Sequence, residues 1–199
     1  EHYKELVDIF IKKNDAATNI SERKYFATES FSVSSAYDAA IYSYFNPSQN
    51  TPLRYGENPH QDGWFLGNLQ DVFTQFHGKQ ISYNNLLDID SAIMLMEDFK
   101  DAIPTFAILK HNNACGFASR TNLLDAYCSA LEADPVSAFG GVLISNKEID
   151  LATATLINNL FCEVVIAPSF HNEALGVLKS KKNRIILKQN HPTFSDKIV

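Results

Sequence analysis

The stretch "EVVIAPSFHNEALGVLKSKKNRIILK", residues 163–188, contains a strand pattern, a helix pattern and a second strand pattern. Residues 163–167 and 184–188 are short and mostly apolar, which is typical of strands buried on both faces. Residues 171–182, between them, have the length and apolar spacing of a helix. Two buried strands joined by a helix form a βαβ unit, so this stretch predicts an α/β fold.

The same alternation extends back to residue 85. In the longer segments apolar residues recur every three to four positions, as in an amphipathic helix, whereas the shorter segments are mostly apolar throughout. We expect helices at residues 85–102, 122–134 and 149–160, and strands at residues 105–110 and 140–145. Short buried strands alternating with helices indicate a largely parallel sheet within one α/β domain.

The N-terminal part has a different pattern and is expected to be a helical lead-in. Residues 1–13 carry an apolar stripe at helical spacing, and residues 23–45 form a second helical region with Ser21 as the expected N-cap. Residues 46–52 are a loop by composition. The irregular stretch after this loop contains two short strand-like pieces, at residues 64–66 and 80–82.

Composition and charge limit the classes of function. With 199 residues, 45% of them apolar, the chain can bury the core of one large domain or two small ones. A net charge of −6 and scattered basic residues argue against a nucleic-acid partner or an acidic membrane surface. A local cationic pocket for a small phosphate remains compatible with this charge. No apolar run reaches the roughly 18 residues of a membrane-spanning helix.

Cysteine usage and the N-terminus bear on the location of the protein. The three cysteines, Cys115, Cys128 and Cys162, are odd in number and widely spaced, which favours a reducing cytosol over a disulfide framework. The N-terminus lacks the basic start and apolar core of a signal peptide. The chain begins with Glu1 and not with Met, which we interpret as a trimmed or excised piece of a longer chain. We therefore expect a cytoplasmic protein.

Lys110 and His111 follow directly on the buried strand pattern "TFAILK". The unperturbed pKa of His lies near neutrality, which suits a general base, and a neighbouring ammonium disfavours the imidazolium form. The same ammonium could stabilise an oxyanion on an attacked carbonyl. The alternative is a Lys at a strand edge beside a His that is hydrogen-bonded within a turn. Spacing alone leaves both interpretations open.

Three further places carry groups suited to a binding site. The loop "LRYGENPHQ", residues 53–61, crowds hydrogen-bonding side chains together, and the planar fork of Arg54 suits phosphate or carboxylate. In "SAFGG", residues 137–141, glycine permits close approach of a ligand, although a tight turn would use it too. Glu163 stands at the start of a strand. We expect the last two places to converge with Lys110 and His111 at one edge of the sheet.

Several common catalytic motifs are absent from the sequence. Neither the H-x-E with P-C-x-x-C pattern of zinc deaminases nor H-E-x-x-H occurs, so no metal site is expected. The glycine-rich nucleotide motifs G-x-G-x-x-G and G-x-x-x-x-G-K-[ST] are also missing. The G-x-S-x-G elbow of hydrolases is not found either.

Five motifs in one order resemble a single family. They are "LRYGENPHQ", "GKQISYNNLLDIDSA", "LKHNNACG", "DPVSAFGGV" and "EVVIAP". Together they resemble the transformylase half of the AICAR transformylase/IMP cyclohydrolase family, from about Phe26 to about Gln189. The resemblance implies a cytidine-deaminase-like three-layer α/β sandwich without zinc. It divides the chain into a lead-in, residues 1–25, and the first transformylase subdomain, residues 26–199, without the cyclohydrolase domain or the second subdomain.

The resemblance implies a reaction and a set of site residues. The family transfers a formyl group from 10-formyltetrahydrofolate, its co-substrate, to the 5-amino group of AICAR, giving FAICAR in IMP biosynthesis. His111 matches the proton acceptor and Lys110 the transition-state stabiliser. The AICAR-contacting positions match Arg54, Tyr55, His111, Gly140 and Glu163, and we add as supporting candidates His60, Asn84, Asn85 and Phe139.

Two points qualify what the resemblance implies. The family often has Pro where this chain has Ala114, which loosens the turn and removes no reacting group. In the family, the second subdomain supplies part of the site, including a catalytic Asn, much of the folate pocket and contacts across a homodimer interface. The alternative function is therefore a non-catalytic nucleotide-binding or dimerisation module.

Overall fold

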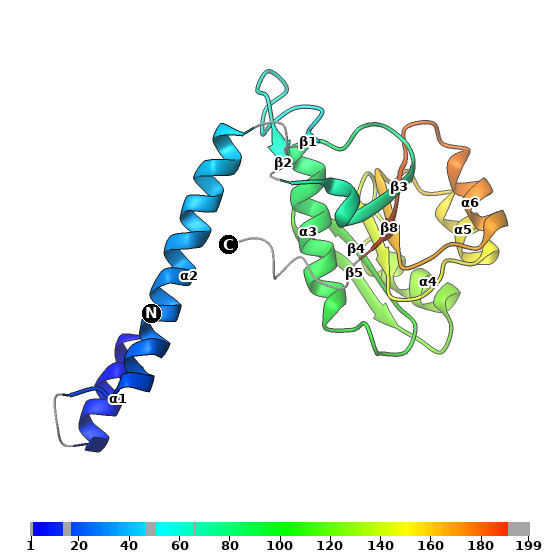
Figure 1. The fold of residues 1–199 in the computed structure, drawn as a ribbon. Helices are drawn as coiled ribbons and strands as arrows, with labels where there is room; N and C mark the ends of the chain where they lie inside the picture. The colour runs from blue at the N-terminus through cyan, green and yellow to red at the C-terminus, as the bar shows by residue number, and fades with distance from the viewer. Residues whose placement is uncertain (1, 14–16, 47–50, 66, 191–199) are drawn as a thin grey trace. The chain divides into compact units, whose positions relative to one another are not determined.

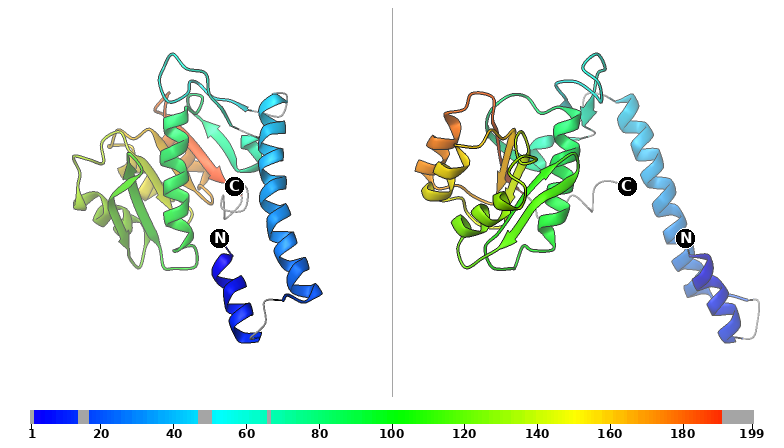
Figure 2. Two further views of the ribbon diagram at one scale, coloured as in Figure 1. Left: turned by 90° about the vertical axis from the view of Figure 1, so that its left-hand side faces the viewer. Right: turned by 180° about the vertical axis from the view of Figure 1, so that it is seen from behind.

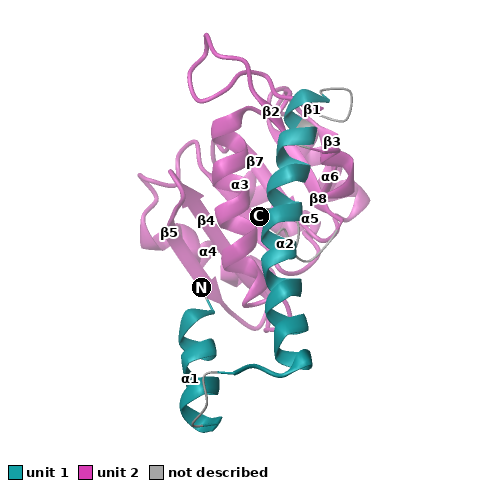
Figure 3. Cartoon of the chain, turned by 60° about the vertical axis from the view of Figure 1, so that its left-hand side comes forward, with its two compact units in different colours: residues 1–48 teal, residues 49–199 magenta. Residues whose placement is uncertain are grey.

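The computed structural model describes residues 2–13, 17–46, 51–65 and 67–190 (Figure 1). The chain divides into two compact units, unit 1 at residues 1–48 and unit 2 at residues 49–199 (Figure 3). The sequence-based boundary at residue 25 falls inside a continuous helix, α2 (Ile20–Phe45), so the observed division lies further along the chain. No helix within the described ranges combines the length and apolar character that crossing a membrane requires.

Unit 1 consists of α1 (Tyr3–Lys13) and α2, so the two expected helices are confirmed. The N-cap of α2 is Asn19 and not Ser21, because the Asn19 side chain accepts from the backbone N–H of Glu22 while the Glu22 carboxylate accepts from the N–H of Asn19. This capping box satisfies two amide donors that the first helical turn leaves unpaired. Ser21 therefore lies inside the helix.

Unit 2 is an α/β unit. Its described residues form a two-stranded sheet, β1 (Thr51–Pro52) with β2 (Trp64–Phe65), and a six-stranded sheet in the order β3-β8-β7-β6-β4-β5. The strands of the larger sheet are β3 (Phe73–His77), β4 (Thr105–Lys110), β5 (Asn113–Ser119), β6 (Val142–Ser145), β7 (Val164–Ala167) and β8 (Ile185–Gln189). The remaining elements are η2 (Leu69–Asp71), α3 (Tyr83–Glu97), α4 (Leu123–Ala133), α5 (Leu151–Ile157) and α6 (Asn172–Lys179).

The larger sheet is mixed, so the prediction of a largely parallel sheet is wrong. Strands β6, β7 and β8 are parallel, as the βαβ pattern indicated, but β3 runs antiparallel to β8 and β4 runs antiparallel to both its neighbours. The direction of β4 depends on β5, a strand in a stretch that was expected to be a turn. Because β5 reverses the chain before α4, this helix crosses over β4 and joins β5 to β6, two strands that share one direction.

Helices cover both faces of the sheet (Figure 2). One set of alternate strand residues, including Ile108, Leu143 and Val165, is buried in the same cluster as residues of α4, α5 and α6. The opposite set, including Leu109 and Ile144, belongs to the cluster with α3. Side chains alternate between the two faces along a strand, so each buried strand serves both layers of helices. The N-cap residues of α3, α4 and α5 are Ser82, Asn122 and Asp150, whose side chains accept hydrogen bonds from the first helical turn.

Two smaller expectations also needed correction. Residues 80–82 are not a strand, and an edge strand of the larger sheet, β3, lies earlier in the chain. The piece at 64–66 is confirmed for Trp64 and Phe65, which form β2, while residue 66 and residues 47–50 of the expected loop lie outside the described residues.

Candidate functional site

The antiparallel orientation of β4 places the expected site residues at one edge of the sheet. In an all-parallel sheet the carboxyl end of β4 would lie opposite the amino ends of β6 and β7. Here Leu109 pairs with Val142 and Val142 pairs with Val164, so these three ends lie side by side. The ammonium of Lys110, the last residue of β4, donates to the carbonyl of Phe139, 2.9 Å away, in the loop before β6.

The loop before β6 is joined to the loop before β7. Gly140 has a φ of 76° and donates its N–H to the carbonyl of Phe161 at 2.7 Å. The aromatic rings of Phe139 and Phe161 lie 5.0 Å apart between centroids. The N–H of Glu163 donates to the carbonyl of Gly141 at 3.0 Å. Gly140 is therefore held, in a conformation that glycine adopts readily, between Lys110 and Glu163.

His111 lies with Asn112 in the two-residue connection between β4 and β5. Both residues have positive φ, 53° and 63°, as a type I′ hairpin turn requires. The N–H of Asn112 donates to the carboxylate of Asp88, on α3, at 2.8 Å, and the Asn113 side chain donates to the carbonyl of His111 at 2.8 Å. Strand β4 and helix α3 thus fix the backbone that carries the exposed His111 side chain.

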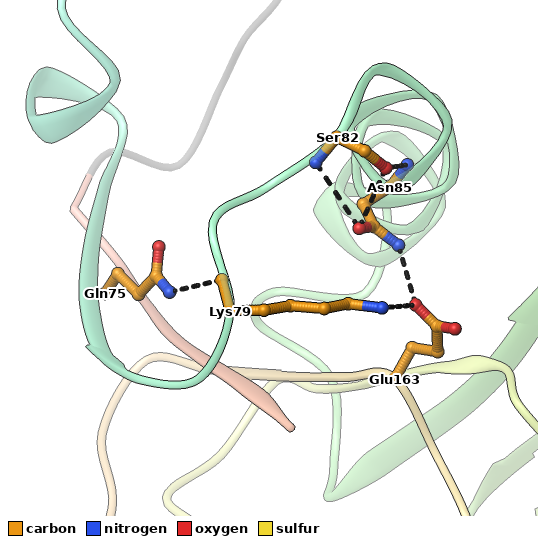
Figure 4. Close-up of polar contacts among 5 residues, drawn as sticks. All are labelled: Gln75, Lys79, Ser82, Asn85 and Glu163. Carbon is orange, nitrogen blue, oxygen red and sulfur yellow. Dashed lines mark hydrogen bonds and ion pairs between the residues drawn. The ribbon is translucent and has the colours of Figure 1, made fainter. Parts of the chain in front are cut away.

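Glu163 is the centre of a polar cluster (Figure 4). Its carboxylate accepts from the Lys79 ammonium at 2.7 Å and from the Asn85 amide at 3.1 Å. Burial alone would raise the pKa of Glu163, but the hydrogen bonds from Lys79 and Asn85 and the charges of Lys79 and Arg54 outweigh it and lower this pKa. Glu163 is therefore an ionised acceptor at neutral pH.

The loop that carries Arg54 and Tyr55 is attached to the start of α3. The N–H of Arg54 donates to the carbonyl of Ile81 at 3.0 Å, and the N–H of Tyr83 donates to the carbonyl of Tyr55 at 3.2 Å. The Arg54 guanidinium carbon lies 5.3 Å from the centroid of the Tyr55 ring, which is a cation–π geometry. The Asn84 side chain donates to the carbonyl of Glu57 at 3.1 Å. Because Asn85 follows in the same helical turn, this loop adjoins the Glu163 cluster.

The structure thus brings most of the expected residues together in unit 2. One group is connected by hydrogen bonds and consists of Lys110, Phe139, Gly140, Glu163 and Asn85. A second group lies at the start of α3 and consists of Arg54, Tyr55 and Asn84. His60 is exposed, and no hydrogen bond among the described residues links it to either group. The functional roles of all these residues remain predictions.

Sequence reasoning missed Lys79 and Asp88. Both lie within the motif "GKQISYNNLLDIDSA", but neither stands at the end of a predicted strand. Lys79 follows Gly78, whose φ of 100° marks a tight turn, and this Gly-Lys pair was the available signal. A cavity of about 430 Å³ lies beside Glu163, lined by Lys79 and by residues of the loops before β7 and β8.

The arrangement combines cations, an ionised carboxylate and hydrogen-bonding amides at one sheet edge. Such a set can bind an anion and accept hydrogen bonds from hydroxyl or amine donors. Across the described ranges, no three side chains of His, Cys, Asp or Glu come together as metal ligands would. This is an α/β protein with a polar site of the kind that suits a phosphorylated small molecule.

Comparison with known proteins identifies the family. The family model described as "AICARFT/IMPCHase bienzyme" matches residues 1–198, so the chain belongs to this family. The chain is 53% identical over 195 residues to the bifunctional purine biosynthesis protein PurH of Bacteroides thetaiotaomicron, covering 93% of this chain and 38% of that protein.

Other relatives carry the same name. The PurH protein of Chlorobium phaeobacteroides is 35% identical over 211 residues, covering 94% of this chain and 40% of that protein. That of Bacillus thuringiensis is 41% identical over 200 residues, covering 90% and 39%. The chain thus spans about two-fifths of the length of these relatives.

Proposed function

We propose that this chain supplies the AICAR-binding and proton-transferring part of an AICAR transformylase site. The observation that carries the proposal is the convergence of Lys110, Gly140 and Glu163 at one sheet edge, within motifs that resemble the transformylase half of the family. The finer assignment of the fold as a cytidine-deaminase-like sandwich without zinc is part of this proposal. So are a role in purine biosynthesis and a cytoplasmic location.

In the proposed reaction, the 5-amino nitrogen of AICAR attacks the formyl carbon of 10-formyltetrahydrofolate. A carbon–nitrogen bond forms, the bond from the formyl carbon to N10 of the folate breaks, and N10 takes up a proton. His111 accepts the proton that the attacking amine loses. An ammonium has three donors, so Lys110 can bind Phe139 with one and the developing oxyanion with another.

The remaining residues would bind AICAR. The Arg54 guanidinium suits the phosphate, because its planar fork can make two parallel hydrogen bonds. The Glu163 carboxylate suits hydroxyl or amide donors of the nucleotide. Gly140 lets the ligand approach the backbone closely, and Tyr55 offers an aromatic face beside Arg54. We expect most folate-binding groups to lie outside these residues.

The proposal is tested by titrating AICAR calorimetrically into the chain and assaying formyl transfer on the same preparation. We expect weak AICAR binding with turnover far below that of a complete enzyme. Holding two substrates in attack geometry contributes about 7–11 kcal/mol, and this chain would hold only one of them well. Absence of AICAR binding would contradict the proposal, and turnover like that of a complete enzyme would contradict the incomplete-site interpretation.

A second candidate function is that of a dimerisation module, favoured by α2. Its exposed apolar side chains, described within unit 1, include Phe31, Val33, Tyr37, Tyr44 and Phe45. Exposed apolar residues gathered on one element are typical of interaction surfaces. Light scattering after size exclusion would test it: a concentration-independent monomer would contradict it, whereas a homodimer that loses its partner in Phe31→Glu would support it.

A further inference from the structure

Lys79 is held in place by its backbone. Gly78 has a φ of 100°, and a Cβ on it would lie 2.2 Å from the carbonyl oxygen of Arg184, so no other residue fits at this turn without a shift. The Gln75 side chain donates to the carbonyl of Lys79 at 2.9 Å (Figure 4). The turn after β3 therefore directs Lys79 toward the amino end of β7.

The side chain of Lys79 binds only one of the two oxygens of Glu163. The Lys79 ammonium and the Asn85 amide both donate to Oε2, at 2.7 Å and 3.1 Å. The orientation of the Asn85 amide is itself set, because the Ser82 hydroxyl donates to its Oδ1 at 3.0 Å. Among the described residues no hydrogen bond reaches Oε1 of Glu163. One oxygen is thus anchored, and the other remains available as an acceptor.

We propose that Lys79 is a positioning residue, which anchors Oε2 of Glu163 so that Oε1 is presented to a hydroxyl or amine donor of the bound nucleotide. The nucleotide part of this inference rests on the proposed function. The Lys79–Glu163 pair is partly shielded, with 25% and 31% of the two side chains exposed, so water competes with it less than with a surface pair.

Other charged groups also surround Glu163 and must be considered for any dependence on pH. They are Arg54, in the loop after β1, and Lys181, Lys182 and Arg184, in the loop before β8 that lines the cavity beside Glu163. Burial raises the pKa of Glu163, and Lys79 is one of the groups that oppose this effect. Without Lys79, fewer groups would oppose it. The pKa of Glu163 should therefore rise, and the ionised acceptor should be lost at a higher pH than in the wild type.

The variants Lys79→Met and Lys79→Arg test the inference, with Lys100→Met as a matched control. Lys100 makes an ion pair of similar type with Glu97 on the surface, at 2.5 Å. The first measurement is the pKa of the Glu163 carboxyl, by carbon NMR of the chain. Lys79→Met should raise this pKa, because burial then acts against fewer opposing groups, whereas Lys79→Arg and Lys100→Met should leave it near the wild-type value. An unchanged pKa in Lys79→Met would overturn the inference.

The second measurement is AICAR affinity at pH 7 and pH 5. Lys79→Met should weaken binding about tenfold at pH 7, as loss of a charged hydrogen bond to the acceptor would, and more at pH 5. In the Glu163→Gln background the same change should add little, because Lys79 acts through Glu163. Additive losses would overturn the inference. A wild-type chain that does not bind AICAR would instead overturn the proposed function and the nucleotide part of this inference together.

Discussion

His111 and Asn112 occupy the left-handed backbone conformation, which is uncommon for residues other than glycine, although Asn and His adopt it more often than most. Left-handed conformations of non-glycine residues cost about 1–3 kcal/mol each and persist where surrounding contacts enforce them. Here the contacts are the Asp88 carboxylate on the N–H of Asn112 and the Asn113 amide on the carbonyl of His111. The expected catalytic His is therefore placed by a strained turn that a neighbouring helix holds.

Asp88 should stabilise this turn. Asp88→Ala removes the acceptor and should lower the free energy of unfolding of the chain by about 1–2 kcal/mol, as measured by urea denaturation. Asp88→Asn keeps an oxygen that can accept from Asn112 and should lose less. If Asp88→Ala were as stable as the wild type, the turn would not depend on this contact.

His111 should be needed for turnover and not for binding. His111→Ala and His111→Asn, assayed in a protein that carries a complete transformylase site, should each lower the rate of formyl transfer by about 10²–10⁴-fold, which is the usual effect of removing a general base. Asn tolerates the left-handed conformation, so His111→Asn separates loss of the imidazole from loss of the turn. AICAR affinity should change little. Wild-type turnover in either variant would remove His111 from the proposed role.

Arg54 should contribute more to binding of a ligand that carries a phosphate than to binding of one that does not. Arg54→Lys should weaken binding of AICAR far more than binding of its dephosphorylated riboside, because an ammonium cannot reproduce the bidentate geometry of a guanidinium. Calorimetry with both ligands measures the difference. Arg120→Lys, at an exposed position after β5, is the control and should change neither affinity. Equal losses for the two ligands would move Arg54 away from the phosphate.

At the scale of the elements, strands with continuous apolar runs could be predicted from sequence and the others could not. Strands β4, β6, β7 and β8 are buried through most of their length, and each was expected close to its observed position. Strand β5, "NACGFAS", carries small and polar residues and looked like a turn. Strand β3, "FTQFH", is an edge strand in which polar residues interrupt the apolar ones, so it has no continuous apolar run. Missing β5 led to the wrong direction for β4, and missing β3 hid the antiparallel pairing at the other edge of the sheet.

Gly116 explains how β5 fits into the sheet. A Cβ at this position would lie 2.0 Å from the carbonyl oxygen of Ala130 on α4, whereas one at Gly176 on α6 would meet nothing within 4 Å. Gly116→Ala should therefore lower the free energy of unfolding by about 1–3 kcal/mol. Gly176→Ala should raise it by about 0.5–1 kcal/mol, since alanine favours a helix. Urea denaturation of both variants checks the contrast, and equal effects would contradict the close packing of α4 on β5.

The candidate site could be predicted where residues stand at strand ends. Lys110, Gly140 and Glu163 were expected there, and the structure connects them by hydrogen bonds through neighbouring loops. Lys79 could not be found in this way, because it reaches Glu163 across a separation of 84 residues through a tertiary contact. Asp88 lies within α3 and accepts a hydrogen bond from the backbone of a distant turn, and no local sequence pattern predicts such a contact.

At the scale of the whole molecule, the two compact units differ in how they bury apolar residues. Unit 2 has two buried clusters, one on each face of its sheet, and these provide a self-contained core. Unit 1 has no buried residue on α1 and many exposed apolar residues on α2. We therefore assign the candidate site to unit 2 and consider unit 1 in terms of association.

The central claim is that AICAR binds at the sheet edge formed by the end of β4 and the starts of β6 and β7. An NMR titration of the isotopically labelled chain with AICAR tests this claim most directly. The backbone amide signals of residues 54–55, 110–112, 139–141 and 163 should shift together and saturate with one affinity. Shifts confined to the opposite sheet edge, at residues 119–122 and 146–149, or no saturable shift at all, would contradict the claim.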